Sequence, residues 1–362
     1  MARWFFHRLL RAAIVATLVT VPCAAQTPVT FALDSVFYGD NTEFFGPFRD
    51  GETIVGASQR LFADIEASDR ATLRLGLYLM QRAGSASPVD RGLPIVTLML
   101  GTSRQRFIMG TLDTGKRVAG FGPDTTTPHG LLPALAVESL WFTRAYEAGV
   151  QWVTKTRRFE QDSWFDYQKM NTPEHRELFD AGSVGRLRGS SPVSLVYQWH
   201  VVHHGGQQYD KGPVSDSVGY GPGVLVEGRL PAIGKASIEA YTLFAYDRPD
   251  REDPTQTVLG RALFVRAAAD RNLWRAHVIV WRGDDFMHEQ GDPNYLSRYP
   301  DGTRYSGTRD YSEAGLTRLF KPAPTIELEA SGRLHLVERQ RAYSYRLLAT
   351  IHLDLWRTLI GK

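Results

Sequence analysis

Residues 325–356 alternate between apolar and polar positions in two runs that a short charged turn separates. Apolar residues such as Leu328 and Leu334 share one face of the first run, and Leu347 and Leu353 share one face of the second. Successive side chains of a strand point to opposite faces, so the pattern predicts two strands that are each apolar on one side. Each run is about 11 residues long, close to the length that carries a tilted strand across a bilayer.

The same alternation recurs from residue 27 to the end, whereas strong helix signals are scarce. A short segment at 27–36 is the first candidate strand. The clearest later segments are 55–65, 71–80, 147–155, 194–204, 237–244 and 274–285. Weaker ones are 95–101, 107–112, 163–169, 179–187, 223–230, 260–268 and 311–320. With the closing hairpin, this predicts an all-β protein of about 16 antiparallel strands.

The connections between these segments alternate between short and long. The short ones are 68–70, 103–105, 159–162, 189–192, 232–235, 270–272 and 321–324. The other set is 39–52, 84–93, 115–142, 171–175, 205–216, 247–256, 287–308 and 339–342, of which 171–175 and 339–342 are fairly short. Short turns at one rim and long loops at the other are typical of transmembrane β-barrels, and an even strand count puts both termini of the chain on the short-turn, periplasmic side.

The first 25 residues read as a secretory signal peptide. Three arginines, Arg3, Arg8 and Arg11, precede an apolar stretch of about 11 residues and the small pair Ala24–Ala25. We expect cleavage after Ala25, which leaves one barrel domain at 26–362 and removes Cys23, the single cysteine. Without those three arginines the chain has 39 basic and 39 acidic residues, so no basic footprint for nucleic acid remains.

Tryptophans are expected in a ring at the short-turn rim, where a membrane interface selects indoles; the alternative is ordinary core packing. Trp164, Trp274 and Trp356 are the candidates. With these features the chain resembles bacterial outer-membrane β-barrels, general porins most nearly, over residues 27–362. The resemblance is architectural. One departure is that the chain continues past Trp356, whereas such barrels usually end on an aromatic residue.

This resemblance implies a Gram-negative outer-membrane protein that lets small polar solutes diffuse through a water-filled lumen. Expected partners are outer-membrane lipid and lipopolysaccharide, the barrel assembly machinery and a small polar or carbohydrate solute. No nucleic acid is expected, and assembly into a homo-oligomer stays open. No G-x-S-x-G, H-E-x-x-H, P-loop or EF-hand motif occurs, so we expect no enzyme, no catalytic residue and no cofactor.

Two polar clusters leave a metal site open as an alternative. His200, His203 and His204 form the first cluster, but on one strand only two of the three can converge, which favours histidines at the barrel rim. The second cluster consists of acidic residues, Asp284, Asp285, Glu289 and Asp292. They could hold a divalent cation, but a solvated acidic loop is the simpler interpretation, so no metal is predicted.

Polar residues that alternate with apolar ones must face inward, because a charge against lipid costs roughly 2–4 kcal/mol at the bilayer midplane. The predicted lining residues are Arg60, Asp64, Arg74, Glu147, Gln151, Asp166, Glu239, Arg275, His277, Glu327, Glu329, Arg333, His335, His352 and Asp354. They would either line a pore and set its selectivity or form a ladder of ion pairs that fills the lumen. Sixteen strands leave an aqueous channel unless a loop closes it, which favours the pore.

The longest connection, 115–142, is a candidate constriction loop, because the third external loop of general porins folds into the barrel. Its segment 131–140 is too apolar to stay in water. We expect it to pack on the inner wall and to bring Asp124 or Glu138 near inward arginines such as Arg74. A lid over the mouth or an adhesive surface for a neighbouring barrel are the alternatives.

Two other functions remain open. A non-conducting barrel could bind or export envelope polysaccharide through aromatic loops near Tyr295, Tyr299, Tyr305 and Tyr311. An outer-membrane lipid hydrolase would need a serine and a histidine within hydrogen-bond reach, which sequence cannot establish across strands.

Overall fold

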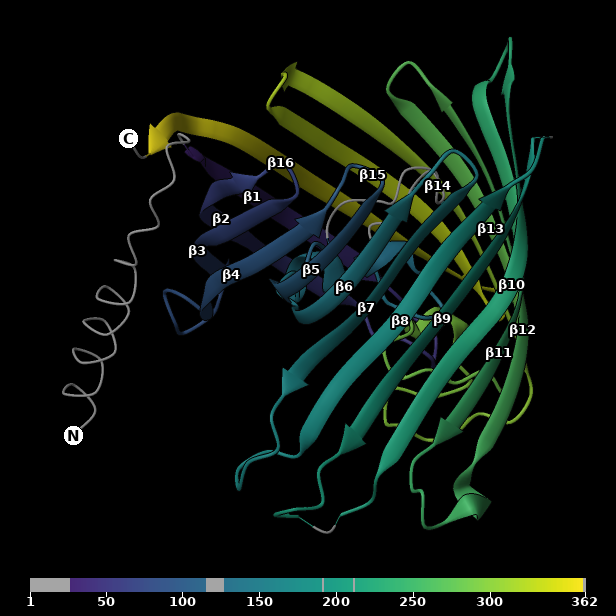
Figure 1. Cartoon of the computed structure of the whole chain (residues 1–362). Helices are drawn as coiled ribbons and strands as arrows, with labels where there is room; N and C mark the ends of the chain where they lie inside the picture. Colours follow the sequence, from purple (N-terminus) through teal and green to yellow (C-terminus); the bar gives the residue numbers. More distant parts are fainter. Residues whose placement is uncertain (1–26, 115–126, 191, 211, 361–362) are drawn as a thin grey trace.

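The computed structural model describes residues 27–360 except 115–126, 191 and 211, and strands make up most of it (Figure 1). The strands are β1 (Thr27–Glu43), β2 (Glu52–Ser68), β3 (Ala71–Arg82), β4 (Arg91–Gly101), β5 (Gln105–Thr111), β6 (Ala148–Lys155), β7 (Phe159–Lys169), β8 (Glu177–Arg188), β9 (Val193–Gly205), β10 (Ser215–Leu230), β11 (Gly234–Arg248), β12 (Val258–Arg271), β13 (Trp274–Asp284), β14 (Thr308–Ala323), β15 (Ile326–Val337) and β16 (Gln340–Ile360). The short helices are η1 (Pro128–Gly130), α2 (Leu140–Thr143), η2 (Pro254–Gln256) and η3 (Pro293–Tyr295). None of the described helices is long and apolar enough to cross a membrane.

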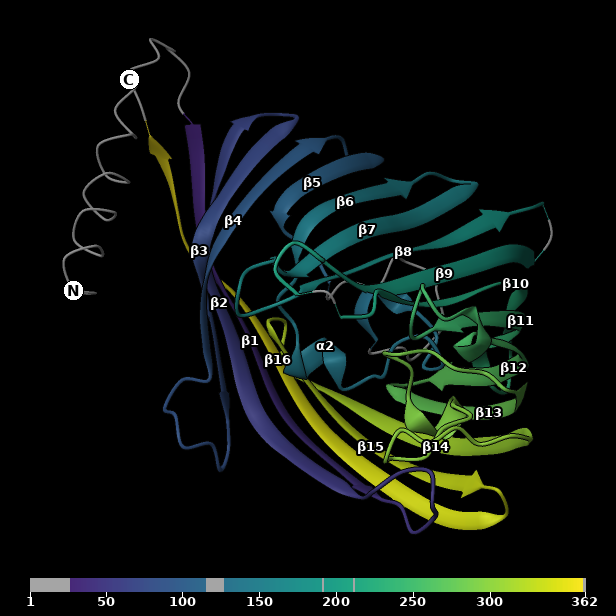
Figure 2. The same cartoon turned by 90° about the horizontal axis from the view of Figure 1, so that it is seen from below.

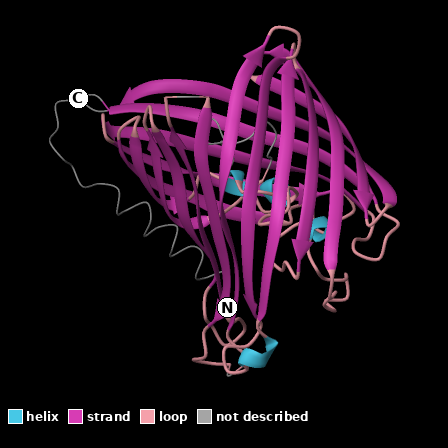
Figure 3. Cartoon of the chain, turned by 90° about the vertical axis from the view of Figure 1, so that its right-hand side faces the viewer, coloured by secondary structure: helices cyan, strands magenta, loops and turns pink. Residues whose placement is uncertain are grey.

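Each strand pairs antiparallel with its neighbour in sequence, and β1 pairs with β16 to close a barrel of 16 strands (Figure 3). This confirms the predicted fold class. The closing hairpin is β15 and β16, joined at Glu338 and Arg339, which both have positive φ (46° and 70°). Two consecutive residues in that conformation form the tight turn whose twist matches that of the flanking strands. The charged turn between the two alternating runs is therefore a two-residue hairpin loop.

The outer face of the barrel is apolar between two polar rims. On β13 the outward positions run from Trp274 through Ala276, Val278 and Val280 to Arg282, and Val278 is 50% exposed. Eight residue steps of a strand span about 26 Å, which strand tilt shortens to about 20 Å along the barrel axis. This is close to the apolar band of a transmembrane barrel, about 25 Å tall. Trp274 lies at its short-turn edge, as predicted.

The prediction that Trp164 belongs to this ring of indoles is wrong. β7 begins at Phe159, so Trp164 lies in mid-strand, on the inward face that it shares with Asp162 and Asp166. Its side chain is buried inside the barrel and stacks on His129, with ring centroids 3.9 Å apart. The strand starts earlier than the alternation suggested, and that shift moves the indole from the rim to the interior.

Loops from the long-loop end fill much of the barrel interior (Figure 2). We call residues 127–147, between β5 and β6, the lumenal loop. Its Leu131, Leu132 and Leu135 are fully buried in one cluster with wall residues such as Val184 and Tyr241. Burying one such leucine contributes roughly 1.5–3 kcal/mol. The apolar half of the loop therefore packs on the inner wall and does not lie over the mouth.

His129 pins the lumenal loop to the wall. Its Nδ1 lies 2.8 Å from Asp162 of β7, and its Nε2 lies 2.8 Å from Glu147, just before β6. Burial opposes the charged form, but Asp162 and Glu147 raise the pKa of His129 well above its ordinary value. An imidazolium with a carboxylate on each nitrogen therefore joins the loop to β6 and β7.

The raised pKa of His129 predicts a pH-dependent stability. A group whose pKa is raised on folding stabilises the fold fully below its unfolded pKa, about 6.5 for histidine, and loses this contribution as the pH rises through the folded value. The free energy of unfolding should therefore fall as the pH rises from about 6.5, and it should fall less in His129→Gln. Urea unfolding followed by tryptophan fluorescence measures both. Parallel pH profiles for the two proteins would contradict the pinning role.

The apolar belt predicts a strong effect of charge at its centre. Val278→Arg should destabilise the inserted barrel by roughly 2–4 kcal/mol, because it puts a cation against lipid. Val278→Leu is the matched control and should insert normally. The measurement is the fraction of protein that migrates as a heat-modifiable folded band after refolding into vesicles. Normal insertion of Val278→Arg would mean that β13 does not face lipid there.

Candidate active site

The predicted lining residues occupy inward positions, and most of them are paired with neighbours. Arg74 binds Asp64 on the adjacent strand at 2.7 Å, and Arg275 binds Asp270 at 2.9 Å. Further partners join Glu239 to Arg266, Glu327 to Lys321, His352 to Asp34, Gln151 to Asp162, Asp166 to the Ala148 amide and Arg60 to the Ala145 carbonyl. Asp354 lies 3.5 Å from His352. The described wall thus has the features of the ion-pair ladder, and a role in conduction stays a prediction.

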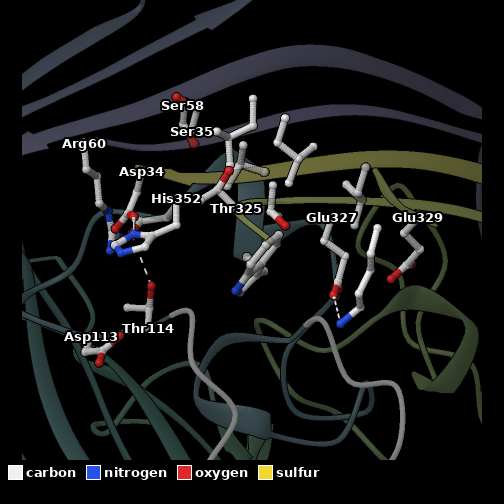
Figure 4. A pocket seen from close by; sticks show the side chains of 18 of the residues that line it. Asp34, Ser35, Ser58, Arg60, Asp113, Thr114, Thr325, Glu327, Glu329 and His352 are labelled. Carbon is white, nitrogen blue, oxygen red and sulfur yellow. Dashed lines mark hydrogen bonds and ion pairs between the residues drawn. The ribbon is translucent and has the colours of Figure 1, made fainter. Parts of the chain in front are cut away.

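A cavity of about 830 Å³ opens toward the short-turn end of the lumen (Figure 4). Asp34, Arg60, His352 and Glu329 line it together with residues of the lumenal loop, among them Trp141. We call this cavity the vestibule. The lumenal loop forms its inner boundary.

A second, smaller cavity lies on the other side of the lumenal loop and holds about 30 Å³, room for a single water molecule. Its walls are the long-loop ends of β1 and β14–β16, the loop 44–51 and the segment 137–139. Nearly every side chain around it is polar or charged. We call it the polar cavity.

Ser344 and His335 meet in the polar cavity. Ser344 Oγ lies 2.8 Å from His335 Nε2, and His335 Nδ1 lies 2.8 Å from the Tyr311 hydroxyl. Tyr311 donates its proton to Glu313 at 2.6 Å, so its oxygen accepts from His335 Nδ1–H. His335 Nε2 is then the unprotonated nitrogen and accepts from the Ser344 hydroxyl. A hydroxyl held by the free nitrogen of an oriented histidine is the arrangement of an activated nucleophile.

Glu313 anchors this chain of hydrogen bonds. Its carboxylate accepts from Tyr311 and from His277 Nε2 at 2.7 Å, and it lies 3.3 Å from His335 Nδ1. These donors hold it as an anion beside the imidazole. Because Ser344 and His335 are only 9% and 5% exposed, these hydrogen bonds are largely shielded from water.

Strand register brings these groups together from three parts of the sequence. His335 on β15 lies opposite Glu313 on β14 and one step diagonally from Ser344 on β16. The sequence placed His335 and His277 on the inward face and named Tyr311 only as a possible sugar-binding residue, but it missed Ser344 and Glu313. The alternation of the last strand would have put Ser344 on the same face as Arg346, which was the available signal.

Glu138 lies at the edge of the polar cavity, but not near Arg74 as expected. It accepts from Arg333 and Arg346, each at 2.7 Å, whereas Arg74 is paired with Asp64. Burial alone would raise the pKa of Glu138, but the two arginines lower it to about 2. The expectation for Asp124 falls outside the described residues.

The two candidate metal clusters are dispersed into separate pairs. His203 binds Asp216 and His204 binds Glu289, whereas His200 lies 3.7 Å from Asp180. The acidic residues likewise pair apart, Asp284 with Thr308, Asp285 with Arg304 and Asp292 with Arg49. Within the described ranges, no group of three or more histidine, cysteine, aspartate or glutamate side chains is arranged so that it could hold a metal ion.

The loop tyrosines are engaged in packing. Tyr295 and Tyr311 are buried and meet edge to face at 4.9 Å. Tyr299 and Tyr305 pack against Phe48 of the loop 44–51. A sugar-binding role for these rings stays a prediction.

Comparison with solved structures identifies bacterial outer-membrane barrels of similar fold. A loop-deletion mutant of OmpT, an outer membrane protein of Vibrio cholerae, matches with a TM-score of 0.55 and 12% identity over 90% of this chain and 99% of that one. The anion-selective porin from Comamonas acidovorans matches with a TM-score of 0.52 and 10% identity, over 90% of this chain and 100% of that one. Identities this low show the fold alone.

Among curated proteins, none matches the chain. A barrel of this fold, in a chain that also matches a lipid A family, lies in the outer membrane of a Gram-negative bacterium, as predicted.

A family model described as lipid A 3'-O-deacylase-type matches residues 21–356. A deacylase is an enzyme, so the prediction that the chain has no enzymatic function is wrong. The prediction relied on sequence motifs of soluble hydrolases, and a serine–histidine pair on two different strands, such as Ser344 and His335, forms no such motif. Since the match covers nearly the whole chain, this protein belongs to the lipid A 3'-O-deacylase-type family.

Proposed function

We propose that the protein is an outer-membrane esterase that removes an ester-linked acyl chain from lipid A. The observation that carries the proposal is the hydrogen-bonded chain Ser344–His335–Tyr311–Glu313 inside the barrel. The family description supports the substrate class. The polar cavity lies toward the long-loop end, which faces the outside of the cell, where lipid A forms the outer leaflet.

Ser344 acts as the nucleophile. Its Oγ attacks the ester carbonyl carbon while His335 Nε2 accepts the hydroxyl proton. The Nδ1–H of the imidazolium continues to donate its hydrogen bond to the Tyr311 oxygen, and the Glu313 carboxylate stabilises the positive charge of the ring. His335 then gives the Nε2 proton to the leaving sugar oxygen as the ester C–O bond breaks. Water, activated by the same nitrogen, releases the fatty acid from Ser344.

Tyr311 distinguishes this site from a triad in which the carboxylate binds histidine directly. The hydroxyl relays the orienting hydrogen bond, because Glu313 lies 3.3 Å from His335 Nδ1 while Tyr311 lies at 2.8 Å. A tyrosine remains neutral and does not compete for the proton that His335 takes from Ser344. It therefore fixes the imidazole tautomer while Glu313 supplies the charge.

Access to the pair runs past the loop 44–51. Phe44 covers His335 with ring centroids 4.9 Å apart, and Arg49 of the same loop binds Asp292. A cavity that holds one water cannot admit an acyl ester, so the loop must move when substrate binds. The loop belongs to the rim, where Phe45 is 69% exposed and can contact lipid.

Passive diffusion is the weaker proposal for this barrel. The lumenal loop borders both the vestibule and the polar cavity, so it lies between them inside the lumen. Conductance would need a route around that loop. The fold similarity to porins gives no separate support, since one fold hosts many functions.

Removal of the nucleophile or the base tests the proposal. Ser344→Ala and His335→Gln should each reduce fatty-acid release from lipid A by at least about a thousandfold, because each breaks the same nucleophilic unit. Fatty-acid release from lipid A micelles, followed by mass spectrometry, is the measurement. Ser312→Ala is the matched control, because this β14 serine faces outward and should leave the rate unchanged.

The comparison of variants also separates mechanisms. If Ser344→Ala keeps the full rate while His335→Gln is inactive, histidine activates water directly and Ser344 is not the nucleophile. Full activity in both variants would place the chemistry elsewhere. Heat-modifiable migration of each variant verifies that the barrel is folded.

A further inference from the structure

The polar cavity contains an internal anion held by two arginines. Glu138 of the lumenal loop reaches Arg333 on β15 and Arg346 on β16, at 2.7 Å from each. Both arginines belong to strands of the wall, whereas the carboxylate belongs to a loop. The cationic part of this cluster is therefore fixed by the sheet, and only the anionic part sits on a segment outside it.

The surroundings of the pair favour an anion. Glu138 stays ionised although it is enclosed, because the two guanidinium groups compensate for lost hydration. Two other carboxylates lie near Arg333: Glu313 at 3.6 Å, which is already held by Tyr311 and His277, and Asp40, which also lines the cavity. Arg346 is only 3% exposed, so a bound anion there is poorly screened by water.

A buried hydroxyl in the same cavity has no partner among the described residues. Ser331 lies directly opposite Arg346 in the strand register, and its Oγ is buried without a hydrogen bond. A buried hydroxyl left unpaired is costly, and it commonly marks a place where a ligand or water binds. Both arginines bind one oxygen of Glu138, Oε2, whereas a phosphate on the same two arginines has further oxygens that Ser331 could reach.

We propose that Arg333, Arg346 and Ser331 form a phosphate subsite for lipid A, and that Glu138 occupies it as an internal substitute when substrate is absent. The inference rests on the proposed esterase function for the identity of the ligand. In lipid A a phosphate is attached to the carbon next to the one that carries the 3'-O-acyl ester. Substrate binding then exchanges one anion for another on the same two arginines.

The subsite is at the right distance from the nucleophile. Arg346 follows Ser344 by two residues on the same face of β16, about 7 Å along the strand. Arg333 lies directly opposite Ser344 on β15. A phosphate between the arginines would therefore lie no farther from Ser344 Oγ than the width of one sugar ring. A phosphate on the carbon next to the scissile ester requires this separation.

Binding to the Ser344→Ala variant of the full chain tests the subsite without hydrolysis. In detergent micelles this protein should bind lipid A about tenfold to a hundredfold more tightly than the same lipid without the neighbouring phosphate, as expected for a charge-assisted contact. Arg346→Gln in the same background should bring the ratio close to one. Arg282→Gln is the matched control, because this arginine is 67% exposed by side chain on the outer wall and should keep the ratio.

Glu138→Gln tests the internal substitute. Removing the competing charge should tighten binding of the phosphorylated lipid severalfold and leave binding of the dephosphorylated lipid unchanged. Weaker binding of both lipids would show that Glu138 only holds the loop in place, which overturns the substitute role. A competition experiment with inorganic phosphate distinguishes the two sources of the ligand. If inorganic phosphate displaces the lipid and binds with the same affinity, free phosphate is the ligand and the lipid assignment is overturned.

The outcomes keep this inference apart from the esterase proposal. Equal binding of the two lipids by Ser344→Ala overturns the subsite, whether or not the wild-type protein hydrolyses lipid A. A preserved phosphate preference with no hydrolysis by wild type supports the subsite and removes the esterase. If Arg346→Gln does not fold, the comparison of the two lipids and the Glu138→Gln result decide the question.

Discussion

Charge pairing constrains the inner wall of this barrel, because loops fill much of the interior and bury many of the charged side chains of the wall. A buried ion without a counterion is too costly to keep, so the wall charges pair across neighbouring strands where register allows. Arg74 and Asp64 show the simple case. Where the wall has a surplus of one sign, a loop supplies the other. Arg333 and Arg346 receive Glu138, and Asp162 receives His129.

These loop contacts explain why the barrel is filled. The lumenal loop combines apolar residues that need a dry surface with two charged residues, His129 and Glu138, that bind groups of opposite charge on the wall. Burial of the leucines stabilises the loop on the wall, whereas His129 and Glu138 fix its position, since each charge pair forms at one place only. The same loop consequently brings a carboxylate to the edge of the polar cavity, next to Ser344 and His335.

The strands and their alternation could be predicted from sequence alone, because a strand that faces lipid on one side must alternate. The site could not be predicted in this way. Ser344, His335 and Glu313 are on three strands, and their contacts depend on register, which single-residue shifts would destroy. Trp164 shows the sensitivity: a strand that starts a few residues early turned an expected rim residue into the stacking partner of His129. Glu138 was identified as an inward group, but its arginine partners lie about 200 residues away in sequence, and no local pattern encodes that pairing.

A barrel of 16 strands is wide enough for a channel, and that width is what made diffusion the first expectation. Width alone does not decide function, because the same interior can be given to loops. Once loops occupy it, the wall offers what a catalytic site needs: rigid strands, alternate residues held a few ångströms apart, and exclusion of bulk water. Strand register then places serine, histidine, tyrosine and glutamate in hydrogen-bond order without any local sequence motif. The absence of soluble-hydrolase motifs is therefore weak evidence against catalysis in any β-barrel, since its inward residues are assembled across the sheet and not along the chain.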